Sequence, residues 1–369
     1  MTKNSIISES KIRLFVDAHI FDGIPQGTVT FLSGIYSELI KDQRFRLYVG
    51  SADKSLAEKF LGGTDFVHIS YKKESKFRRL LYTIPQILTA NQIDYAHFQY
   101  ISPIQKRCKY IVTTHDLLFL EFPWSFPLSY RIKNLFLFYI SAKRADLITT
   151  VSQYSRESIN KYFRIPLRRI TLIPNGVKKN PEKPEPIDQL TGKKFLLYIS
   201  RIEPRKNQAL LIKVWKELDL YNRDIDLVLV GSEGLKDLNF IKEINQLSEQ
   251  EKNHFHWFKN VTSRNLDWMY QNCNLFIFPS SAEGFGIPPL EAAINGAKVL
   301  CSNTTAMKEL NFWGKFNFNP NSVTEFKNAL SFALTHDFDH QFAIEKIELT
   351  YNWKKIAEDF GNLIFTDFR

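Results

Sequence analysis

The sequence has few cysteines and no long hydrophobic run. Its three cysteines, Cys108, Cys273 and Cys301, lie far apart among 369 residues and show no CxxC spacing. This pattern argues against a zinc site or a redox motif and predicts buried free thiols. No stretch reaches the roughly 18 apolar residues of a membrane span, and polar residues interrupt the N-terminus where a signal peptide has its apolar centre. We therefore expect a cytoplasmic protein.

Acidic residues are the minority among the charged residues, since the chain has 49 Lys and Arg, 39 Asp and Glu, and a net charge of +10. The basic residues form short groups at 72–79, 106–109 and 164–169, all in the first half. Each group is by default solvated surface, and the alternative is contact with an anionic membrane surface on its cytoplasmic side or with a pyrophosphate-bearing lipid. No nucleic-acid-binding module is recognisable, so we expect no nucleic acid partner.

Short runs of β-branched and aromatic residues alternate with amphipathic stretches along the chain. This alternation is typical of parallel sheets covered by helices, and the length suits two domains. The predicted strands are 12–18, 46–50, 66–70, 95–99, 110–116, 146–152 and 170–176 in the first half, and 195–200, 225–232, 255–258, 274–280 and 297–303 in the second. The sequence therefore predicts an α/β fold of two Rossmann-like, doubly wound domains that face a cleft.

The segment 178–194 has three prolines, mixed charge and no apolar period, which is typical of an interdomain linker. We accordingly expect an N-terminal domain at 1–177 and a C-terminal domain at 195–350. The last segment, 351–369, is an aromatic-rich amphipathic helix candidate that we expect to cross back to the N-terminal domain.

Two glutamates flank a glycine-rich turn after the predicted strand 274–280, in the sequence EGFGIPPLE from Glu283 to Glu291. Gly284 and Gly286 allow the backbone to approach a ligand, and the prolines suit the first turn of a helix. A helix N-terminus attracts phosphate or sugar oxygens, and the Glu291 carboxylate can accept hydrogen bonds from a ribose diol. The alternative is that Glu283 caps the helix and Glu291 is merely exposed.

The sequence RIEPRKN follows the predicted strand 195–200, and two of its cations, Arg201 and Lys206, are candidate ligand-binding residues. Arg201 lies at the strand end and Lys206 directly before the next helix, a position from which both could neutralise a diphosphate leaving group. A solvated basic turn is the alternative.

These residues resemble the retaining glycosyltransferases of GT-B fold, family 4, and most of all their mannosyl- and rhamnosyltransferase branches. The most specific match is Glu283 to Glu291, which fits that family's two glutamates separated by seven residues. The resemblance implies that Glu283 faces the donor sugar, that Glu291 binds the ribose, and that the Phe285 and Gly286 backbone lies near sugar and phosphate. It also implies that Arg201 and Lys206 bind the diphosphate.

The resemblance extends to the first half of the chain. Gly27 matches the family's glycine in the first strand-to-helix turn, although this chain has Gln26, Gly27 and Thr28 where many members have a longer glycine run. His115 matches the family's acceptor-side histidine, and Asp116 could orient His115 or the acceptor hydroxyl. Asn175 with Gly176 resembles the hinge.

A metal-binding DxD motif is mimicked by Asp224 and Asp226, but these residues come before the apolar run LVLVG at 227–231 and do not follow a strand. A solvated turn is therefore the preferred interpretation, and Arg201 and Lys206 take the place of a divalent cation. We expect no metal and no cofactor beyond the nucleotide-diphosphate sugar that serves as donor substrate.

The leading hypothesis is a retaining, metal-independent hexosyltransferase that moves a sugar from a nucleotide donor to a glycan or lipid-linked acceptor of a surface polysaccharide or glycolipid. GDP-mannose is the first candidate for the donor. Two alternatives stay open. One is a catalytically silent homologue that binds a sugar or serves as a scaffold, and the other is a UDP-sugar epimerase on the same fold, against which the Glu283 motif argues.

Overall fold

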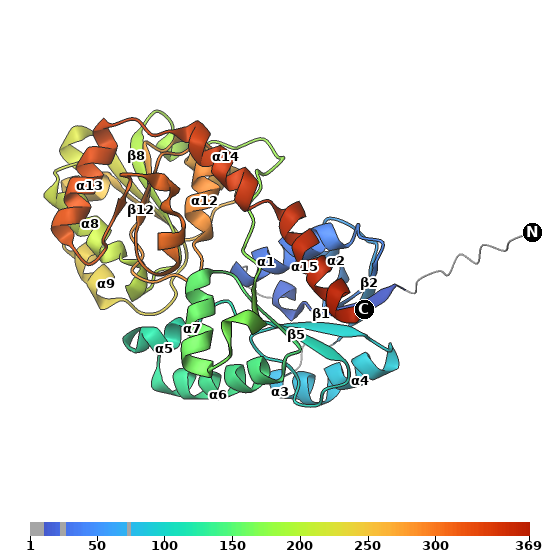
Figure 1. Ribbon diagram of the computed structural model, residues 1–369. Helices are drawn as coiled ribbons and strands as arrows, with labels where there is room; N and C mark the ends of the chain where they lie inside the picture. The colour runs from blue at the N-terminus through green and yellow to red at the C-terminus, as the bar shows by residue number, and fades with distance from the viewer. Residues whose placement is uncertain (1–10, 23–26, 72–74) are drawn as a thin grey trace, which may run out of the picture.

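Two parallel sheets, each covered by helices, make up the protein in a computed structural model that describes residues 11–22, 27–71 and 75–369. Figure 1 shows one sheet in each of two domains, and the linker segment runs between them. All twelve predicted strands are present, and a short thirteenth, Asn317–Phe318, was missed because two residues carry no periodicity. The predicted fold class is confirmed.

The N-terminal sheet has seven strands in the order β3-β2-β1-β4-β5-β6-β7. Its strands are β1 Ile12–Asp17, β2 Phe45–Ser51, β3 Val67–Ser70, β4 Tyr95–Gln99, β5 Lys109–Thr113, β6 Leu147–Thr150 and β7 Ile170–Leu172. Its helices are α1 Gly27–Leu39, α2 Lys54–Leu61, α3 Lys76–Arg78, α4 Ile84–Ala90, α5 Leu118–Glu121, α6 Leu128–Arg144 and α7 Gln153–Phe163, with shorter turns η1 His19–Asp22, η2 Arg79–Thr83, η3 Pro123–Ser125 and η4 Leu167–Arg169.

The C-terminal sheet has six strands in the order β10-β9-β8-β11-β12-β13. Its strands are β8 Lys194–Ile199, β9 Ile225–Val230, β10 Phe255–Phe258, β11 Leu275–Phe278, β12 Val299–Ser302 and β13 Asn317–Phe318. Its helices are α8 Gln208–Glu217, α9 Leu238–Asn245, α10 Glu249–Asn253, α11 Ser263–Asn272, α12 Ile287–Ile294, α13 Val323–Thr335 and α14 His340–Thr350, with turns η5 Asp188–Leu190, η6 Pro204–Lys206, η7 Tyr221–Arg223, η8 Thr305–Glu309 and η9 Asn311–Trp313.

The strand order reverses once in each sheet, between β1 and β4 in the first and between β8 and β11 in the second. Loops that leave the carboxyl ends of strands on either side of such a point diverge and leave a crevice for a ligand. The segment of Gly27 follows β1, that of Arg201 and Lys206 follows β8, and that of Glu283 follows β11. The topology therefore brings three of the sequence-predicted segments to the two switch points.

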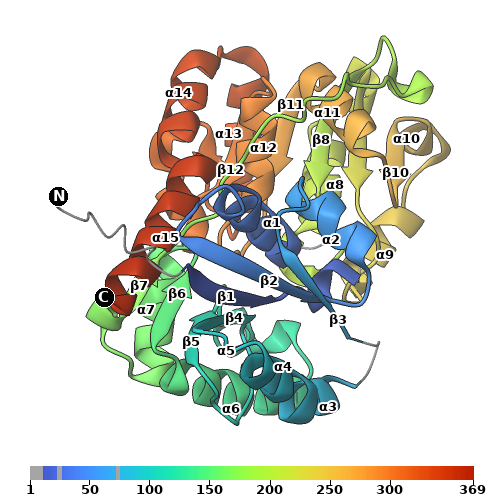
Figure 2. The same cartoon turned by 90° about the vertical axis from the view of Figure 1, so that its right-hand side faces the viewer.

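The final helix, α15 Trp353–Phe368, leaves the C-terminal domain and packs against α1. Figure 2 shows it beside the N-terminal sheet. A Cβ at Gly34 would lie 2.3 Å from the Trp353 ring, and one at Gly176 would lie 2.6 Å from it, so both glycines make room for this indole. Asp367 accepts hydrogen bonds from Tyr95 and Lys109, at 2.6 and 3.0 Å. Trp353 thus joins α15 to the end of the N-terminal domain.

The linker is fastened to the C-terminal domain through α11. The Asn180 amide donates to Asp267 at 2.8 Å, the Arg264 guanidinium donates to the Lys183 carbonyl at 2.9 Å, and the Glu185 N–H donates to the Arg264 carbonyl at 3.1 Å. A proline-rich segment held in this way is a fixed strap rather than a free tether.

The interpretation of Asp224 and Asp226 as a solvated turn is wrong for Asp226. Asp224 ends η7 in a left-handed conformation, whereas Asp226 lies inside β9 and is buried. Its carboxylate binds Lys193, His254 and His256 at 2.7–2.8 Å. Burial would raise the pKa of Asp226, but the hydrogen bonds from His256, Lys193 and His254 outweigh it and hold this pKa at about 2. Asp226 and its three partners therefore stabilise the fold at the amino end of β9.

Two further predictions have simple outcomes. The three cysteines are free, with Cys301 buried and the other two half-buried.

Residues 72–74 of the first basic group, together with residues 1–10, lie outside the described residues. Within the described part of the chain, even the 17-residue α6 lacks the combination of length and apolar character that a membrane-crossing helix requires.

Candidate functional site

Glu283 lies at the centre of a buried charge cluster formed by the loops after β8 and β11. Its carboxylate accepts a hydrogen bond of 2.5 Å from the Lys206 ammonium and one of 3.2 Å from the Arg205 guanidinium. Burial would raise the pKa of Glu283, but the charges of Lys206 and Arg205 outweigh it and hold this pKa below its usual value. Burial also lowers the pKa of Lys206, and Arg205 adds to that effect. The sequence prediction that Glu283 and Lys206 lie together matches this geometry.

Arg201 does not join that cluster. Its side chain is 48% exposed and pairs with the buried Glu203 at 2.9 Å, while Arg205 spans Glu203 and Glu283 at 2.8 and 3.2 Å. Arg205, rather than Arg201, therefore shares the Glu283 carboxylate with Lys206, and the binding of a diphosphate by Arg201 and Lys206 stays a prediction. Arg205 Nε is buried without a hydrogen-bond partner in the structure, which leaves one guanidinium donor available.

Sequence reasoning missed Arg205 although it stands next to Lys206. Pro204 opens a one-turn 3₁₀ segment, η6, that ends at Lys206, and the tight turn directs both side chains toward the Glu283 loop. The signal available in the sequence was the presence of three cations within RIEPRK. Which two of the three face inward depends on the turn geometry, and spacing alone does not determine it.

Gly286 stands directly before α12, with φ at +98°. This left-handed conformation favours glycine, and a Cβ here would lie 2.0 Å from the Met307 methyl carbon. Phe285 is buried and packs edge-to-face on Tyr351, with ring centroids 5.6 Å apart. The loop between Glu283 and α12 is thus held by packing on both sides, and it presents the helix start toward the N-terminal domain.

Glu291 lies one turn into α12 and is half-buried. The Tyr270 hydroxyl donates to its carboxylate at 3.2 Å. Burial raises the pKa of Glu291 to about 6. It is neither merely exposed nor part of the Glu283 cluster, so the two motif glutamates lie in separate environments.

His115 lies on the facing side of the cleft, in the loop after β5. Its ring is buried, packs edge-to-face on Phe31 at 5.0 Å, and hydrogen-bonds through Nε2 to the Gln99 amide oxygen at 2.5 Å. The Gln99 amide nitrogen continues to His97 Nε2 at 3.1 Å, and His97 Nδ1 meets the Tyr36 hydroxyl at 2.9 Å. Burial lowers the pKa of His115 to about 3. The imidazole is therefore neutral near pH 7 and belongs to an uncharged hydrogen-bond chain.

Asp116 does not orient His115, contrary to one of the two roles suggested by the sequence. Its carboxylate accepts from the Leu118 N–H at 3.2 Å and from the Tyr100 hydroxyl at 3.4 Å. A Cβ at Gly284 would lie 2.8 Å from Asp116 Oδ2 and Cβ, so this glycine permits the closest approach of the two domains. Burial raises the pKa of Asp116, the Arg205 charge lowers it, and the Glu283 charge raises it. Asp116 thus lies against the glutamate loop of the other domain.

Gly27 is the first residue of α1 and faces α12 across the cleft. A Cβ at Gly27 would lie 3.8 Å from the Ile287 methyl carbon, at the first position of α12. The starts of two helices, one from each domain, therefore meet at this point, and each start has N–H groups without a partner inside the helix and the positive end of a dipole. Residues 23–26, which precede Gly27, lie outside the described residues.

A set of polar contacts holds the two domains together beside this site. The Ser152 hydroxyl donates to the Gly284 carbonyl at 2.7 Å. The Glu309 carboxylate accepts from the Gln153 and Tyr154 N–H groups, at 2.9 and 2.7 Å, and so caps α7 from the other domain. The Ser152 hydroxyl also accepts from the Ser155 N–H at 3.0 Å, a cap that the sequence predicts because a serine directly precedes the helical stretch 153–163, whereas Glu309, 156 residues from Gln153, leaves no local signal.

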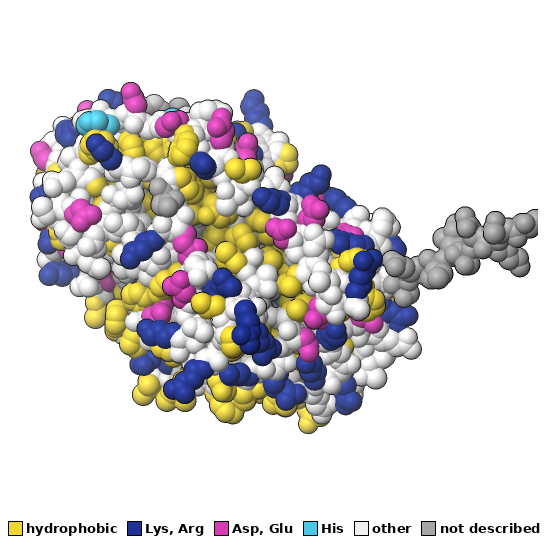
Figure 3. All heavy atoms as spheres, viewed as in Figure 1, with side chains coloured by type: hydrophobic (Ala, Val, Ile, Leu, Met, Phe, Trp, Pro, Cys, Tyr) yellow, Lys and Arg dark blue, Asp and Glu magenta, His cyan; other side chains and the backbone are white. Residues whose placement is uncertain are grey.

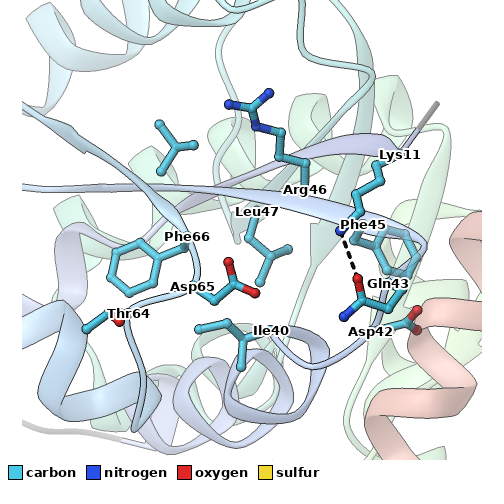
Figure 4. Close-up of a pocket in the computed structure, with 11 residues that line it drawn as sticks. Lys11, Ile40, Asp42, Gln43, Phe45, Arg46, Leu47, Thr64, Asp65 and Phe66 are labelled. Atoms are coloured by element: carbon cyan, nitrogen blue, oxygen red, sulfur yellow. Dashed lines mark hydrogen bonds between the residues drawn. The ribbon is translucent and has the colours of Figure 1, made fainter.

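Other features lie away from these loops. In the part of the chain that the structure describes, no group of three His, Cys, Asp or Glu side chains is arranged to hold a metal ion. A cavity of about 290 Å³ opens at the amino ends of β1, β2 and β3. Figure 4 shows Lys11 hydrogen-bonded to Gln43 there, while Arg46 points away from the other labelled side chains. This cavity is at the sheet edge opposite the loops of Glu283 and His115.

Two family models match successive parts of the chain. Residues 179–350 match the model of glycosyl transferases group 1, and residues 26–180 match that of glycosyltransferase family 4. The chain is 34% identical over 53% of its length to the serotype-specific mannosyltransferase WbdA of Escherichia coli, of which it spans 25%. It is 30% identical over 59% of its length to O-antigen chain mannosyltransferase B of the same species, of which it spans 60%. The chain thus spans between a quarter and three-fifths of these two relatives.

Solved structures with the same fold cover almost the whole chain. HepE of Anabaena in complex with UDP-glucose matches 97% of this chain and 100% of its own, with a TM-score of 0.72 and 19% identity. Sucrose-phosphate synthase of Thermosynechococcus elongatus matches 97% and 99%, with a TM-score of 0.73 and 16% identity. These likenesses show the fold, and the two family models together span residues 26–350. The chain therefore belongs to the group 1 glycosyltransferases of GT-B fold.

Proposed function

We propose that the protein is a retaining, metal-independent hexosyltransferase that moves a sugar from a GDP-sugar to a glycan or lipid-linked acceptor of a surface polysaccharide. Mannose is the first candidate for the sugar. The choice of mannose is supported by the names of the two relatives described above, which are mannosyltransferases, one of them of the O-antigen chain. The reaction type is supported by the charges at the site.

The observation that carries the proposal is the buried cluster of Glu283, Lys206 and Arg205 opposite Asp116 and His115. Two cations held in a buried site are ready to bind an anion, because their desolvation has already been offset by Glu283. A departing nucleoside diphosphate develops negative charge at its β-phosphate, and preorganised cations stabilise that charge most in a site that excludes water. Lys206 and Arg205 would thereby take the part that a divalent cation has in other transferases.

Each remaining residue has a role that follows from its surroundings. Glu283 would accept hydrogen bonds from donor sugar hydroxyls, and Glu291 would do so from the ribose. The Gly27 and Gly286 backbones, at two facing helix starts, would bind the phosphates. Neutral His115 would orient the donor sugar or the acceptor hydroxyl without adding charge. In the proposed retaining step the acceptor attacks on the face that the diphosphate leaves, and a phosphate oxygen takes the proton.

Thermal unfolding with GDP, UDP, dTDP and ADP, each with and without EDTA, tests this proposal first. A ligand at about a hundred times its dissociation constant adds roughly 2.7 kcal/mol to the free energy of unfolding, a shift of a few degrees. We expect GDP to stabilise the protein equally with and without EDTA. Loss of the shift in EDTA and its return with manganese would contradict metal independence, and stabilisation by UDP alone would exclude the GDP-sugar.

Two alternatives predict different results. A silent sugar-binding or scaffold homologue gives no release of nucleoside diphosphate from any donor, with or without acceptor. A UDP-sugar epimerase converts its sugar nucleotide without an acceptor, and it either keeps the bond between sugar and diphosphate or breaks that bond and releases UDP. Slow donor hydrolysis of GDP-mannose, detected as released GDP, favours the transferase because hydrolysis is transfer to water.

A further inference from the structure

Exposed large hydrophobic side chains are concentrated on one helix of the N-terminal domain. Of the 18 such side chains among the described residues, six lie in α6. Leu128, Ile132 and Phe136 are 63%, 63% and 65% exposed, and Leu135 and Tyr139 are each 41% exposed. These five follow a spacing of three or four residues, so they form one continuous stripe, here called the α6 stripe.

The α6 stripe is not needed to hold the helix in the fold. The opposite face of α6 buries Asn134, Phe138, Ser141 and Ala142. Phe138 stacks on Tyr100 with ring centroids 4.6 Å apart, and the Ser141 hydroxyl accepts from the Ser102 N–H at 3.0 Å. A surface helix with one packed face normally has a polar outer face, so a second apolar face indicates a partner.

Cations accompany the stripe, and acidic residues do not. The helix carries Arg131, Lys133, Lys143 and Arg144, and its 17 residues include no Asp or Glu. The Lys133 ammonium lies over the Phe77 ring, 5.5 Å from its centroid, which extends the surface to α3. Trp124, in η3 just before α6, is 76% exposed. Figure 3 shows hydrophobic and basic side chains along the lower edge, where Figure 1 places α6 and α3.

We propose that the α6 stripe, with Trp124, Phe77 and the surrounding cations, docks on an anionic lipid bilayer. Apolar and aromatic side chains of an interfacial helix insert at the level of the lipid headgroups, and Lys and Arg bind the lipid phosphates from the same face. A second copy of this chain fits the surface less well. In an isologous dimer, two faces that carry only positive charge would meet, and such a contact is unfavourable.

Docking in this orientation brings the bilayer beside the cleft. Tyr130, in the first turn of α6, packs edge-to-face on Phe119, with ring centroids 6.0 Å apart, and lies within electrostatic reach of Asp116, Arg201 and Glu203. One end of α6 therefore borders the loops of both domains while its stripe faces outward. A lipid-linked acceptor could reach the cleft directly from the membrane. This last point rests on the proposed function, whereas docking itself does not.

Sedimentation with phosphatidylcholine vesicles, with and without phosphatidylglycerol, tests docking without donor or acceptor. We expect the protein to bind the anionic vesicles at low salt and to bind neutral vesicles weakly. Ile132→Glu with Phe136→Glu should abolish binding, and Lys133→Glu with Lys143→Glu should lower the partition coefficient by about tenfold or more. The matched controls are Leu349→Glu with Phe342→Glu, on exposed residues of α14, and these should bind as the parent does.

Three outcomes would overturn the proposal. They are no binding to anionic vesicles at low salt, equal binding by the Ile132 and Phe136 variant, and a dimer of the parent in analytical ultracentrifugation that this variant disrupts. The cooperative thermal unfolding of each variant without ligand shows whether it is folded. Because vesicle binding and nucleotide binding are measured separately, failure of docking leaves the proposed transferase activity standing, and the reverse also holds.

Discussion

The two sides of the cleft differ in the charge of the residues that each would use in the reaction. The C-terminal side buries Glu283 with Lys206 and Arg205, three ionised groups within hydrogen-bond distance. The N-terminal side places neutral His115 at the end of a chain of uncharged groups that runs through Gln99 and His97. In the proposed reaction the donor brings two phosphate charges and the acceptor brings a neutral hydroxyl. The division of charge between the domains therefore corresponds to the chemistry that each would handle.

The largest effect is expected from Glu283→Gln. The amide keeps one neutral acceptor oxygen but loses the charge and the second acceptor oxygen that would hold the donor sugar, so turnover should fall by about a thousandfold. Lys206 would then lack its counter-charge and Arg205 would keep only Glu203, so GDP should bind at least as tightly as in the parent. Turnover measured with GDP-mannose, together with calorimetric binding of GDP, separates the two effects.

Stability supplies the control for that variant. A buried pair that loses one charge costs about 3 kcal/mol or more, so Glu283→Gln should unfold at lower urea concentration without ligand and recover with GDP. Turnover within tenfold of the parent, or GDP affinity that falls together with turnover, would contradict the role assigned to Glu283.

Lys206 and Arg201 should differ although the family pattern treats them as a pair. Lys206→Met removes a buried cation from the cluster and should weaken GDP binding by about a hundredfold. Arg201→Met removes a half-exposed cation that already pairs with Glu203, and it should weaken binding by less than about tenfold. Calorimetry on the two variants is the measurement, with Arg205→Met expected to behave as Lys206→Met does. Equal losses for Arg201 and Lys206 would restore the pair that the sequence predicts.

How well the sequence predicts a feature depends on how far apart in the chain the interacting residues stand. Strand runs such as 12–18 and the Ser152 helix cap are local, and the sequence alone predicts both correctly. The glutamate loop is local too, because the two glycines and two prolines that shape it stand within nine residues. Gly27, Lys206 and Glu283 reach the cleft because parallel strands deliver their loops to one edge of each sheet.

Contacts between distant segments could not be predicted in this way. Glu309 caps a helix of the other domain, and Asp116 approaches Gly284 across the cleft, and both depend on how two whole domains meet. Asp226 was interpreted as part of a solvated turn although the predicted strand 225–232 contains it, because its three partners stand 28 to 33 residues away and leave no local signal. The choice between Arg201 and Arg205 depended on a single turn of 3₁₀ helix.

Gly284→Ala tests the close approach of the two sides. The new methyl carbon would lie 2.8 Å from Asp116 Oδ2 and Cβ, so either Asp116 or the glutamate loop must shift. We expect turnover to fall by roughly tenfold to a hundredfold, because a displacement of this size disturbs the alignment of reacting groups. GDP binding, which depends on the C-terminal side, should change little. Gly63→Ala is the control, since its Cβ would make only an ordinary contact at 3.4 Å.

The smallest effect concerns pH and Glu291, the one motif glutamate without a cationic partner in the cluster. Burial raises its pKa from 4.5 to about 6, so the folded state keeps the proton to higher pH than the unfolded state does. Stability from this group is therefore fully present below about pH 4.5 and falls as the pH rises to about 6, by at most about 2 kcal/mol. Glu291→Gln should remove this slope, which urea unfolding of both proteins at about pH 5 and about pH 7 will show. GDP binding by the parent should strengthen over the same interval, because only the ionised carboxylate accepts both ribose hydroxyls. Parallel slopes in the two proteins would mean that Glu291 is as accessible to water as an ordinary surface glutamate.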